Sequence, residues 1–211
     1  VCVGTPTDKN GKPDLKDILK VSDTISKNIK KNDLVIFRST VPVGTMRNII
    51  LPQLEKNGLQ CGADFSLSFA PERTVEGDAL KELSSLPQII GGIDQRSADQ
   101  CKSLFNRITQ TIIQVDSLEE AELVKLLNNT YRDLVFSFAN EVSTICDNYN
   151  INAFNLIHAA NNGYPRNKIP TPSPGVGGTC LSKDPYIYSN PITSNKLDIK
   201  LGKVSRSINN K

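Results

Sequence analysis

Histidine is nearly absent from this 211-residue sequence, and its scarcity excludes several kinds of site. His158 is the one histidine. Metal sites that need two or more histidines are therefore excluded, and a His-dependent catalytic triad would have to use this residue. Because His158 falls on an expected amphipathic helix, we interpret it as structural. Tryptophan is absent as well, and no apolar run approaches the ~20 residues of a membrane-spanning helix, so no membrane association is expected.

Cysteine is present without the spacing of a metal site or a disulfide framework. The five cysteines are an odd number, and none belongs to a C-x-x-C pair. The sequence opens without a signal-peptide pattern, so we expect a reducing compartment, with the cytoplasm as the default location, and no bound metal. Four cysteines lack a glycine-rich or cationic setting and are interpreted as packing or surface residues: Cys2, Cys61, Cys101 and Cys146.

Charge is balanced rather than concentrated in one region. Lys and Arg number 25 against 22 Asp and Glu, a formal net charge of +3, and the lysines are scattered among acids. A nucleic-acid-binding surface is therefore not expected. With 38% apolar residues, the chain can form one large or two small globular domains.

Strand and helix patterns alternate over residues 1–116. Val1–Val3 has the pattern of the end of a buried strand, and apolar runs predict further strands at 34–37, 65–70, 88–93 and 111–115. Helices are predicted between them at 14–30, up to residue 57, and at 97–107. The alternation predicts a parallel α/β layer, in which ligands bind at the carboxyl ends of the strands.

From Ser117 onwards the pattern is helical. Ser117 and Glu120 have the spacing of a capping box, and apolar periodicity continues without Pro or Gly to about Asn148. Such a helix is ~45 Å long and would cross between domains or form a subunit interface. A second helix, 152–161, is predicted to end at Asn162-Gly163. Residues 190–211 are polar and are expected to lack a closing element.

The stretch PGVGGTCLSKDP, residues 174–185, carries the most informative chemical pattern. Its glycines permit close approach of the backbone to a ligand and expose N–H groups that could hold a phosphate or an oxyanion. A helical turn beginning near Cys180 would place the thiol at a positive helix end close to Lys183, which favours the nucleophilic thiolate. Asp184 would share that face. A glycine-rich turn with an incidental cysteine explains the stretch equally well.

The long helix carries a second group of polar residues. Lys125 and Asn129 are spaced i, i+4 and project together, with Glu122 and Arg132 one turn to either side. Lysine and amide groups offered together suit an oxyanion and a sugar hydroxyl. Taken alone, the same residues are better explained as the solvated face of a helix.

Two loops that follow predicted strands also offer polar groups. Glu72 and Glu76, in Ala70–Gly77, could serve as bases or bind hydroxyls. The loop Ser39–Thr45 carries hydroxyls that could reach a ligand. An ordinary charged loop accounts for the first of these, and helix capping accounts for the second.

Taken together and in order, six segments resemble the UDP-glucose/GDP-mannose dehydrogenase family of nucleotide-sugar 6-dehydrogenases. They are VGTP (3–6), STVPVGT (39–45), APERTVEG (70–77), ELVKLLNNTYRD (122–133), FANE (138–141) and GVGGTCLSKD (175–184). The resemblance implies an α/β fold in which residues 1–116 are the C-terminal part of a Rossmann-like NAD-binding domain. Residues 117–211 would form an all-α central domain, similar to that of 6-phosphogluconate dehydrogenase, with a homodimer built around its long helix.

The resemblance also implies an activity, the NAD-dependent four-electron oxidation of a UDP-sugar C6 alcohol to the uronic acid. A cysteine thiohemiacetal and thioester carry the carbon between the two oxidations. APERTVEG and NNTYRD are more similar to the branch that acts on UDP-N-acetylhexosamines, such as UDP-N-acetylmannosamine, than to UDP-glucose 6-dehydrogenases, the alternative. A one-step 3-hydroxyacid or 6-phosphogluconate dehydrogenase would have no use for the thiol. A non-catalytic dimerisation fragment is the alternative from another class.

Residue roles follow from the same resemblance. Cys180 is the implied nucleophile, and Lys125 and Asn129 would stabilise oxyanion charge and hold the reacting sugar, with Lys125 also a candidate base. A water near the thiol would be held by Asp184 and Thr40.

Further matches concern hydrolysis, the cofactor and the substrate. Glu76 would be a base in thioester hydrolysis. Positions that match NAD contacts are Thr5, Thr40, Glu76 and Lys183. Positions that match substrate contacts are Glu72, Lys125, Asn129, Arg132, Tyr164, Arg166 and Gly177.

Two features depart from the family. No G-x-G-x-x-G dinucleotide fingerprint occurs in the sequence. The C-terminal nucleotide-binding domain is absent as well, so we expect a chain that lacks both ends of a longer enzyme. On this basis the 211 residues alone are expected to bind NAD poorly and not to turn over.

Overall fold

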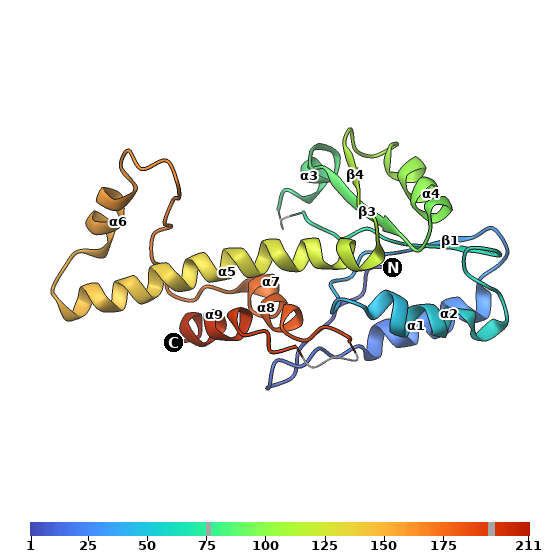
Figure 1. The fold of residues 1–211 in the computed structure, drawn as a ribbon, viewed down its shortest axis with the longest axis horizontal. Helices are drawn as coiled ribbons and strands as arrows, with labels where there is room; N and C mark the ends of the chain where they lie inside the picture. Colours follow the sequence, from blue (N-terminus) through green and yellow to red (C-terminus); the bar gives the residue numbers. More distant parts are fainter. Residues whose placement is uncertain (75–76, 194–196) are drawn as a thin grey trace.

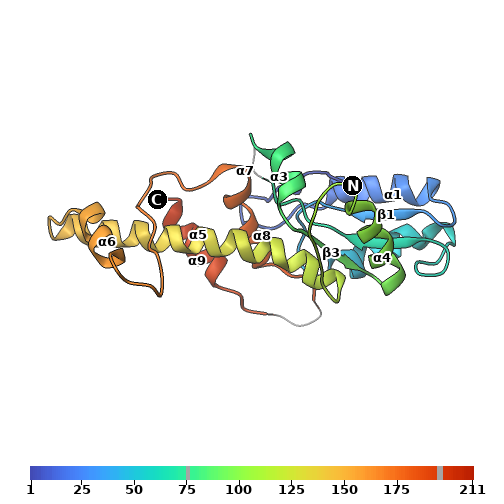
Figure 2. The same cartoon turned by 90° about the horizontal axis from the view of Figure 1, so that it is seen from above.

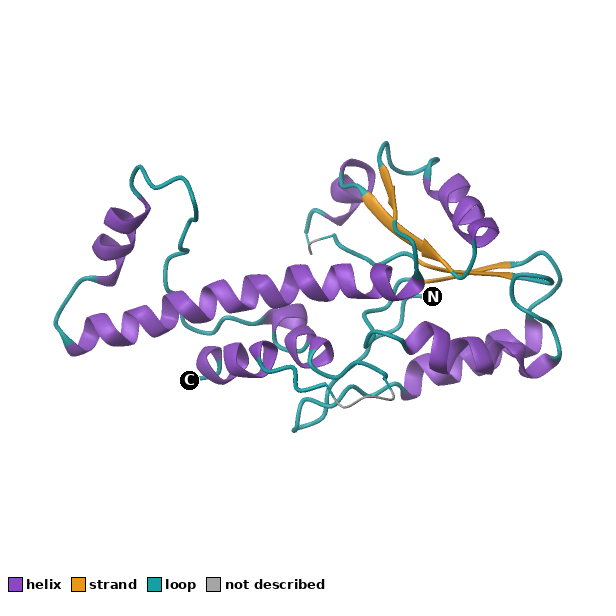
Figure 3. Ribbon diagram, viewed as in Figure 1, coloured by secondary structure: helices purple, strands orange, loops and turns teal. Residues whose placement is uncertain are grey.

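One long helix joins a sheet region to a helical region in the computed structural model (Figure 1). The structure describes residues 1–74, 77–193 and 197–211. Helix α5 (Leu118–Asn148) begins against the sheet and continues to the far end of the molecule, where α6 (Ala153–Asn161) lies. Figure 3 shows the strands gathered at one end and helices alone at the other. The predicted α/β fold with one long helix is confirmed.

The sheet has four strands in the order β1-β2-β3-β4. These are β1 (Leu34–Phe37), β2 (Ser66–Phe69), β3 (Gln88–Gly92) and β4 (Ile112–Gln114). Val1 lies beside β1 with parallel hydrogen bonding, since its nitrogen donates to the Ile36 carbonyl (2.6 Å) and its carbonyl accepts from Arg38 N–H (2.8 Å). Val1 and Val3 are half-buried and Cys2 is exposed, so this segment is not the buried strand that the sequence predicts.

One strand pairing differs from the predicted parallel layer. β1 pairs with β2, and β3 with β4, in parallel, but β2 and β3 are antiparallel, with Ser68 opposite Gly92. Helix α3 (Ala79–Ser85), which connects β2 to β3, has no buried residue. A parallel crossover needs a helix that packs across the sheet face. Because α3 does not pack in this way, β3 returns antiparallel to β2.

Helices cover both faces of the sheet. On one face lie α1 (Lys16–Asn28) and α2 (Leu51–Leu54), the latter between a π-helical turn η1 (Met46–Ile50) and a 3₁₀ turn η2 (Glu55–Asn57). α4 (Gln95–Phe105) packs on the other face. Two adjacent glycines permit this close approach, since a Cβ on Gly91 would lie 2.3 Å from the Ser117 carbonyl and one on Gly92 2.5 Å from Ala98 N. The start of α5 and α4 therefore contact opposite faces of β3.

The start of α5 has the predicted cap, and the helix ends at the predicted residue. Ser117 Oγ accepts the Glu120 N–H (3.1 Å), while the Glu120 carboxylate accepts from Asp116 N–H (3.0 Å). At the far end, α6 is capped by Asn152, and His158 is exposed in its last turn. The 31 residues of α5 include polar residues of the site. The same helix also contacts the C-terminal helices.

Three short helices follow the glycine-rich stretch: α7 (Gly178–Leu181), α8 (Asp184–Tyr188) and α9 (Leu201–Asn209). α9 lies along α5 in both views (Figure 2), so the expectation that residues 190–211 lack a closing element is wrong. The buried face of α9 is largely polar and includes Ser205, Arg206 and Asn209. This face bonds the Asp133 carboxylate on α5. Because the face is polar, apolar periodicity in the sequence does not reveal the helix.

The cysteines outside residues 174–185 behave as predicted. All five cysteines are free; Cys101 and Cys146 are buried, Cys61 is half-buried and Cys2 is exposed. Burial raises the pKa of Cys61 to about 12 and that of Cys101 to about 11, which keeps both as unreactive thiols. Within the described residues, no cluster of three metal-ligating side chains occurs, and no helix is both long and apolar enough to cross a membrane.

A buried carboxylate fastens α5 to the sheet region. Glu122 is 1% exposed and accepts the backbone N–H groups of Gly44 (2.6 Å) and Met46 (2.7 Å) at the start of η1. Burial raises the pKa of Glu122 to about 8, although the two N–H groups act in the opposite direction. The protonated carboxyl is therefore the form that the fold favours.

We expect the free energy of unfolding to fall as pH rises from about 5 to about 8. The stability that protonated Glu122 contributes is fully present below the unfolded-state pKa and is lost as pH rises through the folded-state pKa of about 8. The slope approaches ~1 kcal/mol per pH unit. Denaturant unfolding at several pH values measures it. Glu122→Gln, which cannot titrate, should remove most of this slope, and parallel pH profiles for the two proteins would contradict the assignment.

Candidate active site

A cavity of about 610 Å³ lies between the loop after β2, the middle of α5 and the glycine-rich turn. The predicted site residues that line it are Glu72, Lys125, Asn129, Arg132, Gly177 and Cys180. Three segments that are far apart in the sequence therefore meet at one place. Cys180 therefore shares one cavity with five other predicted site residues.

Cys180 is the third residue of the single helical turn α7, and its side chain is exposed to the cavity. Glycine is needed at two positions before it, because Gly175 and Gly178 have φ values of +64° and +75°, in the left-handed region. The Thr179 hydroxyl lies 3.9 Å from Cys180 Sγ. The thiol thus lies within a single helical turn that begins two residues before it, at Gly178.

Asp184 is the polar centre behind the thiol. Its side chain is fully buried and accepts hydrogen bonds from Asn129 Nδ2 (2.6 Å) and Lys183 Nζ (2.7 Å). The first bond fixes the orientation of the Asn129 amide, which leaves its carbonyl oxygen available to accept from a ligand. The second bond pairs the Lys183 ammonium group with the Asp184 carboxylate. Neither Asp184 nor Lys183 lines the cavity itself.

Lys125 lies among several charged groups. Burial lowers the pKa of Lys125, and Lys183 acts in the same direction, while Asp184 and Cys180 act to raise it. The net shift is downward. An ammonium group of this kind can stabilise a nearby oxyanion and gives up its proton more readily than an exposed lysine does.

Glu72 is held as an anion. Its carboxylate pairs with Arg38 and accepts the backbone N–H groups of Arg73 (2.8 Å) and Thr74 (2.9 Å). Burial acts to raise the pKa of Glu72, but the Thr74 N–H and the Arg38 charge outweigh it and hold the pKa below its ordinary value. Glu72 therefore fixes the loop and is suited to accept hydroxyl hydrogen bonds.

Other predicted residues lie outside the cavity. Tyr164 and Arg166 are exposed in the connection that follows α6, with the guanidinium 5.3 Å from the tyrosine ring centroid. Thr5 and Thr40 are buried near the ends of Val1–Val3 and β1. Glu76 lies outside the residues that the structure describes. The roles given to these residues stay predictions.

The structure adds cavity residues that the sequence patterns did not single out. Arg73 and Thr74 follow Glu72 in the loop, and Asn128 and Tyr131 neighbour Asn129 on α5. Their signal was their position within the segments that resemble the family, and Asn128 also lies three residues after Lys125, which places the two on neighbouring positions of the helix surface. Thr179 and Leu181 complete the wall beside Cys180.

Comparison with known proteins decides the family. Residues 1–109 match the NAD-binding domain of the UDP-glucose/GDP-mannose dehydrogenase family, and residues 119–211 match its central domain. The chain belongs to this family. The match to the NAD-binding domain thus includes β1, β2 and β3, and the match to the central domain includes nearly all of α5 and the Cys180 turn.

Family members of known name are similar over nearly the whole chain. UDP-N-acetyl-D-mannosamine dehydrogenases from Pyrococcus horikoshii and Campylobacter jejuni are each 36% identical over 99% of this chain, and the match covers 49% and 52% of their lengths. The solved structure of the Pyrococcus horikoshii UDP-D-ManNAc dehydrogenase superposes with a TM-score of 0.89 over 99% of this chain and 49% of that one. The chain therefore spans about half the length of the relatives it matches.

The residues near the strand ends fit the nicotinamide cofactor of this family. The Thr5 hydroxyl is buried, and no hydrogen-bond partner for it occurs among the residues described. It lies just beyond Val1–Val3, and Thr40 lies just beyond β1, at the strand ends where α/β sheets bind dinucleotides. A bound dinucleotide would satisfy the unpaired Thr5 hydroxyl. The match to the NAD-binding domain agrees with this fit.

Proposed function

We propose that the protein is an NAD-dependent nucleotide-sugar 6-dehydrogenase that oxidises the C6 alcohol of a UDP-N-acetylhexosamine, with UDP-N-acetylmannosamine as its substrate. The observation that carries the proposal is the meeting of Cys180, Lys125 and Asn129 in one cavity of a member of this family. A thiol beside an oxyanion-stabilising lysine suits an oxidation that passes through a carbonyl. The names of the similar relatives favour the N-acetylmannosamine substrate over UDP-glucose.

In the first oxidation, Lys125 in its neutral form takes the proton of the C6 hydroxyl as C6 becomes an aldehyde. The lowered pKa of Lys125 makes this form accessible. Asn129, oriented by Asp184, holds the reacting oxygen. When bound, NAD⁺ supplies the hydride acceptor twice, so that one alcohol, two NAD⁺ and one water give one carboxylate, two NADH and three protons.

The thiol keeps the aldehyde carbon bound between the two oxidations. Cys180 Sγ adds to C6 as a thiolate, and the carbonyl oxygen takes a proton from Lys125 to give a thiohemiacetal. Loss of hydride from C6 and of the hydroxyl proton to Lys125 leaves a thioester on Cys180. We propose that Asp184 and Thr40 place a water for hydrolysis and that Glu76 accepts its proton. Cleavage of the C–S bond then returns the thiolate and releases the carboxylate.

A panel of UDP- and GDP-sugars offered to the full-length protein with NAD⁺ tests the substrate. We expect NADH formation with UDP-N-acetylmannosamine at a kcat/KM at least ~10-fold above that with UDP-glucose, since the site must accommodate a bulkier C2 substituent. A higher kcat/KM for UDP-glucose would identify UDP-glucose as the substrate, and the proposed class of reaction would be unchanged. No NADH with any nucleotide sugar would contradict the proposed function.

A homodimer through α5 is also part of the proposal. Large apolar side chains repeat at spacings of four and seven residues along α5 and remain exposed; they are Leu127, Tyr131, Phe138, Ile145 and, just past its end, Tyr149. These five residues, which we call the α5 stripe, lie on the side of the helix opposite Asn129 at 100° per residue. Repeats of this kind pack against a second helix.

The second copy would border the active site. Tyr131 belongs both to the α5 stripe and to the cavity wall. Tyr164 and Arg166 lie in the connection after α6, and neither lines the cavity of its own chain. We propose that these two residues contact the substrate from the second copy.

We expect Phe138→Glu to convert the dimer to a monomer, with the dissociation constant raised roughly 100-fold or more. The carboxylate would be buried without a partner at the centre of the α5 stripe. Light scattering coupled to size-exclusion chromatography measures the mass. Asp147→Lys, on the other side of α5, is the matched surface control and should stay dimeric. A wild-type protein that is monomeric at every concentration would contradict the interface.

A further inference from the structure

A second set of contacts links α5 to the glycine-rich turn. Lys125, Asn129 and Asp133 are spaced four residues apart and lie on one face of α5. Lys125 faces the cavity, and Asn129 bonds Asp184. Asp133, the third, lies outside the cavity wall and takes no part in the proposed chemistry.

Asp133 is fully buried and accepts hydrogen bonds from three residues of α9. Its Oδ1 accepts from Arg206 Nη1 (2.8 Å) and Asn209 Nδ2 (2.9 Å), and its Oδ2 accepts from Ser205 Oγ (2.6 Å). Arg206, itself 3% exposed, also donates from Nη1 to the Val176 carbonyl (2.9 Å). The ion pair therefore reaches the backbone of the turn, four residues before Cys180.

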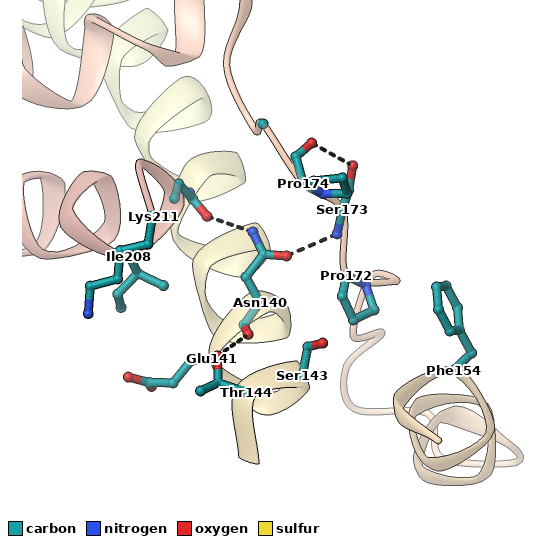
Figure 4. Close-up of a pocket in the computed structure, with 12 residues that line it drawn as sticks. Asn140, Glu141, Ser143, Thr144, Phe154, Pro172, Ser173, Pro174, Ile208 and Lys211 are labelled. Carbon is teal, nitrogen blue, oxygen red and sulfur yellow. Dashed lines mark hydrogen bonds between the residues drawn. The ribbon is translucent and has the colours of Figure 1, made fainter. Parts of the chain in front are cut away.

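The same network fastens the turn a second time. Asn140 Oδ1 accepts the Ser173 backbone N–H (2.9 Å), and Asn140 Nδ2 donates to Asn209 Oδ1 (3.0 Å). Figure 4 shows Asn140 between Ser173 and the C-terminal helix. Asn209 in turn bonds Asp133, so the two attachments, at Ser173 and at Val176, share one buried carboxylate.

This attachment matters because the turn has little stiffness of its own. It contains three glycines within residues 175–178, and glycine leaves the backbone more conformations than any other residue. α7 is a single turn of four residues, too short to be stable without outside contacts. The position of the Cys180 thiol relative to Lys125 thus depends on what holds residues 173–176.

We propose that Arg206 and Asp133 are positioning residues for Cys180. Through the Val176 carbonyl, the buried pair holds the turn so that the thiol remains in the cavity beside Lys125. The proposal rests on the proposed function for its catalytic consequence, but the positioning itself can be measured without turnover. Ion-pair residues that served stability alone would have no specific effect on the turn.

Hydrogen exchange tests the positioning directly. Arg206→Lys keeps a cation near Asp133, but its shorter side chain lacks the Nη1 atom that donates to both Asp133 Oδ1 and the Val176 carbonyl. We expect backbone exchange in residues 174–183 to speed up roughly tenfold or more, while exchange in β3 stays unchanged. Ser205→Ala is the matched control, because it removes a hydrogen bond to the same carboxylate without touching the turn. Equal acceleration in both variants, or none in Arg206→Lys, would overturn the proposal.

A second variant keeps the test decisive if Arg206→Lys does not fold. Asp133→Asn keeps the shape of the side chain but removes the charge that holds Arg206 against Val176, so we expect faster exchange confined to the same peptide. Unchanged exchange there would overturn the proposal. In a catalytically active protein, Arg206→Lys should also release aldehyde that a hydroxylamine trap captures, with the KM for the nucleotide sugar unchanged. If the wild-type protein showed no turnover, the proposed function would be refuted. The hydrogen-exchange measurement would still decide whether Arg206 and Asp133 position the turn.

Discussion

Cys180→Ser is expected to lose uronic acid formation by roughly 1,000-fold or more, because a serine hydroxyl is a far weaker nucleophile than a thiolate. The first oxidation, which depends on Lys125 and Asn129, should persist at a reduced rate. The measurement is the amount of carboxylate and of trapped aldehyde formed per NADH. Such a variant separates the two oxidations, which the wild-type site couples through one covalent bond.

Cys2→Ser is the matched control for this experiment. Cys2 is exposed, as Cys180 is, but does not line the cavity. Its replacement should leave both the rate and the product unchanged. A Cys180→Ser protein that still converted alcohol to carboxylate at the wild-type rate would show that the thiol takes no part and would contradict the thiohemiacetal and thioester route.

Lys125→Met is expected to lower kcat/KM by roughly 100- to 10,000-fold, the range for loss of a positioned acid–base group. The variant removes both the proton acceptor of the first oxidation and the ammonium group that stabilises the later oxyanion. Because burial lowers the pKa of Lys125, the wild-type rate should rise with pH and level off below the range in which an ordinary lysine titrates. The pH dependence of kcat/KM measures this.

Lys125→Arg separates the two roles of the lysine. Arginine keeps the positive charge but does not release a proton in this pH range. We expect the rising limb of the pH profile to disappear while part of the oxyanion stabilisation remains. Lys168→Met, an exposed lysine in the connection after α6, is the control for loss of a charge. A rising limb that survives in Lys125→Arg would assign the proton transfer to another group.

Much of the site follows from local sequence spacing. The capping pair Ser117 and Glu120 fixes where α5 starts, and the start of the helix determines that Lys125 and Asn129 point to the same side. The glycines before Cys180 indicate a glycine-rich turn, and the structure has one, with left-handed φ values at Gly175 and Gly178. Each of these features depends on neighbours within a few residues, which is why the sequence alone reveals it.

The sequence patterns could not predict contacts between segments that are far apart in the chain. The antiparallel pairing of β2 and β3 depends on the failure of α3 to pack on the sheet. The α9 helix escaped prediction because its buried face is polar, and that face has meaning only beside Asp133, 73 residues away from Arg206. Glu122 likewise has the pattern of a surface residue until the Gly44 and Met46 N–H groups are placed against it.

The number of NADH molecules formed per nucleotide sugar tests the central claim most directly. With limiting UDP-N-acetylmannosamine and excess NAD⁺, a site in which Cys180 retains the aldehyde carbon must yield two NADH and one uronic acid for each sugar consumed. The full-length protein is predicted to give this ratio with no aldehyde in the trap. One NADH per sugar, accompanied by an aldehyde or ketone product, would contradict the account.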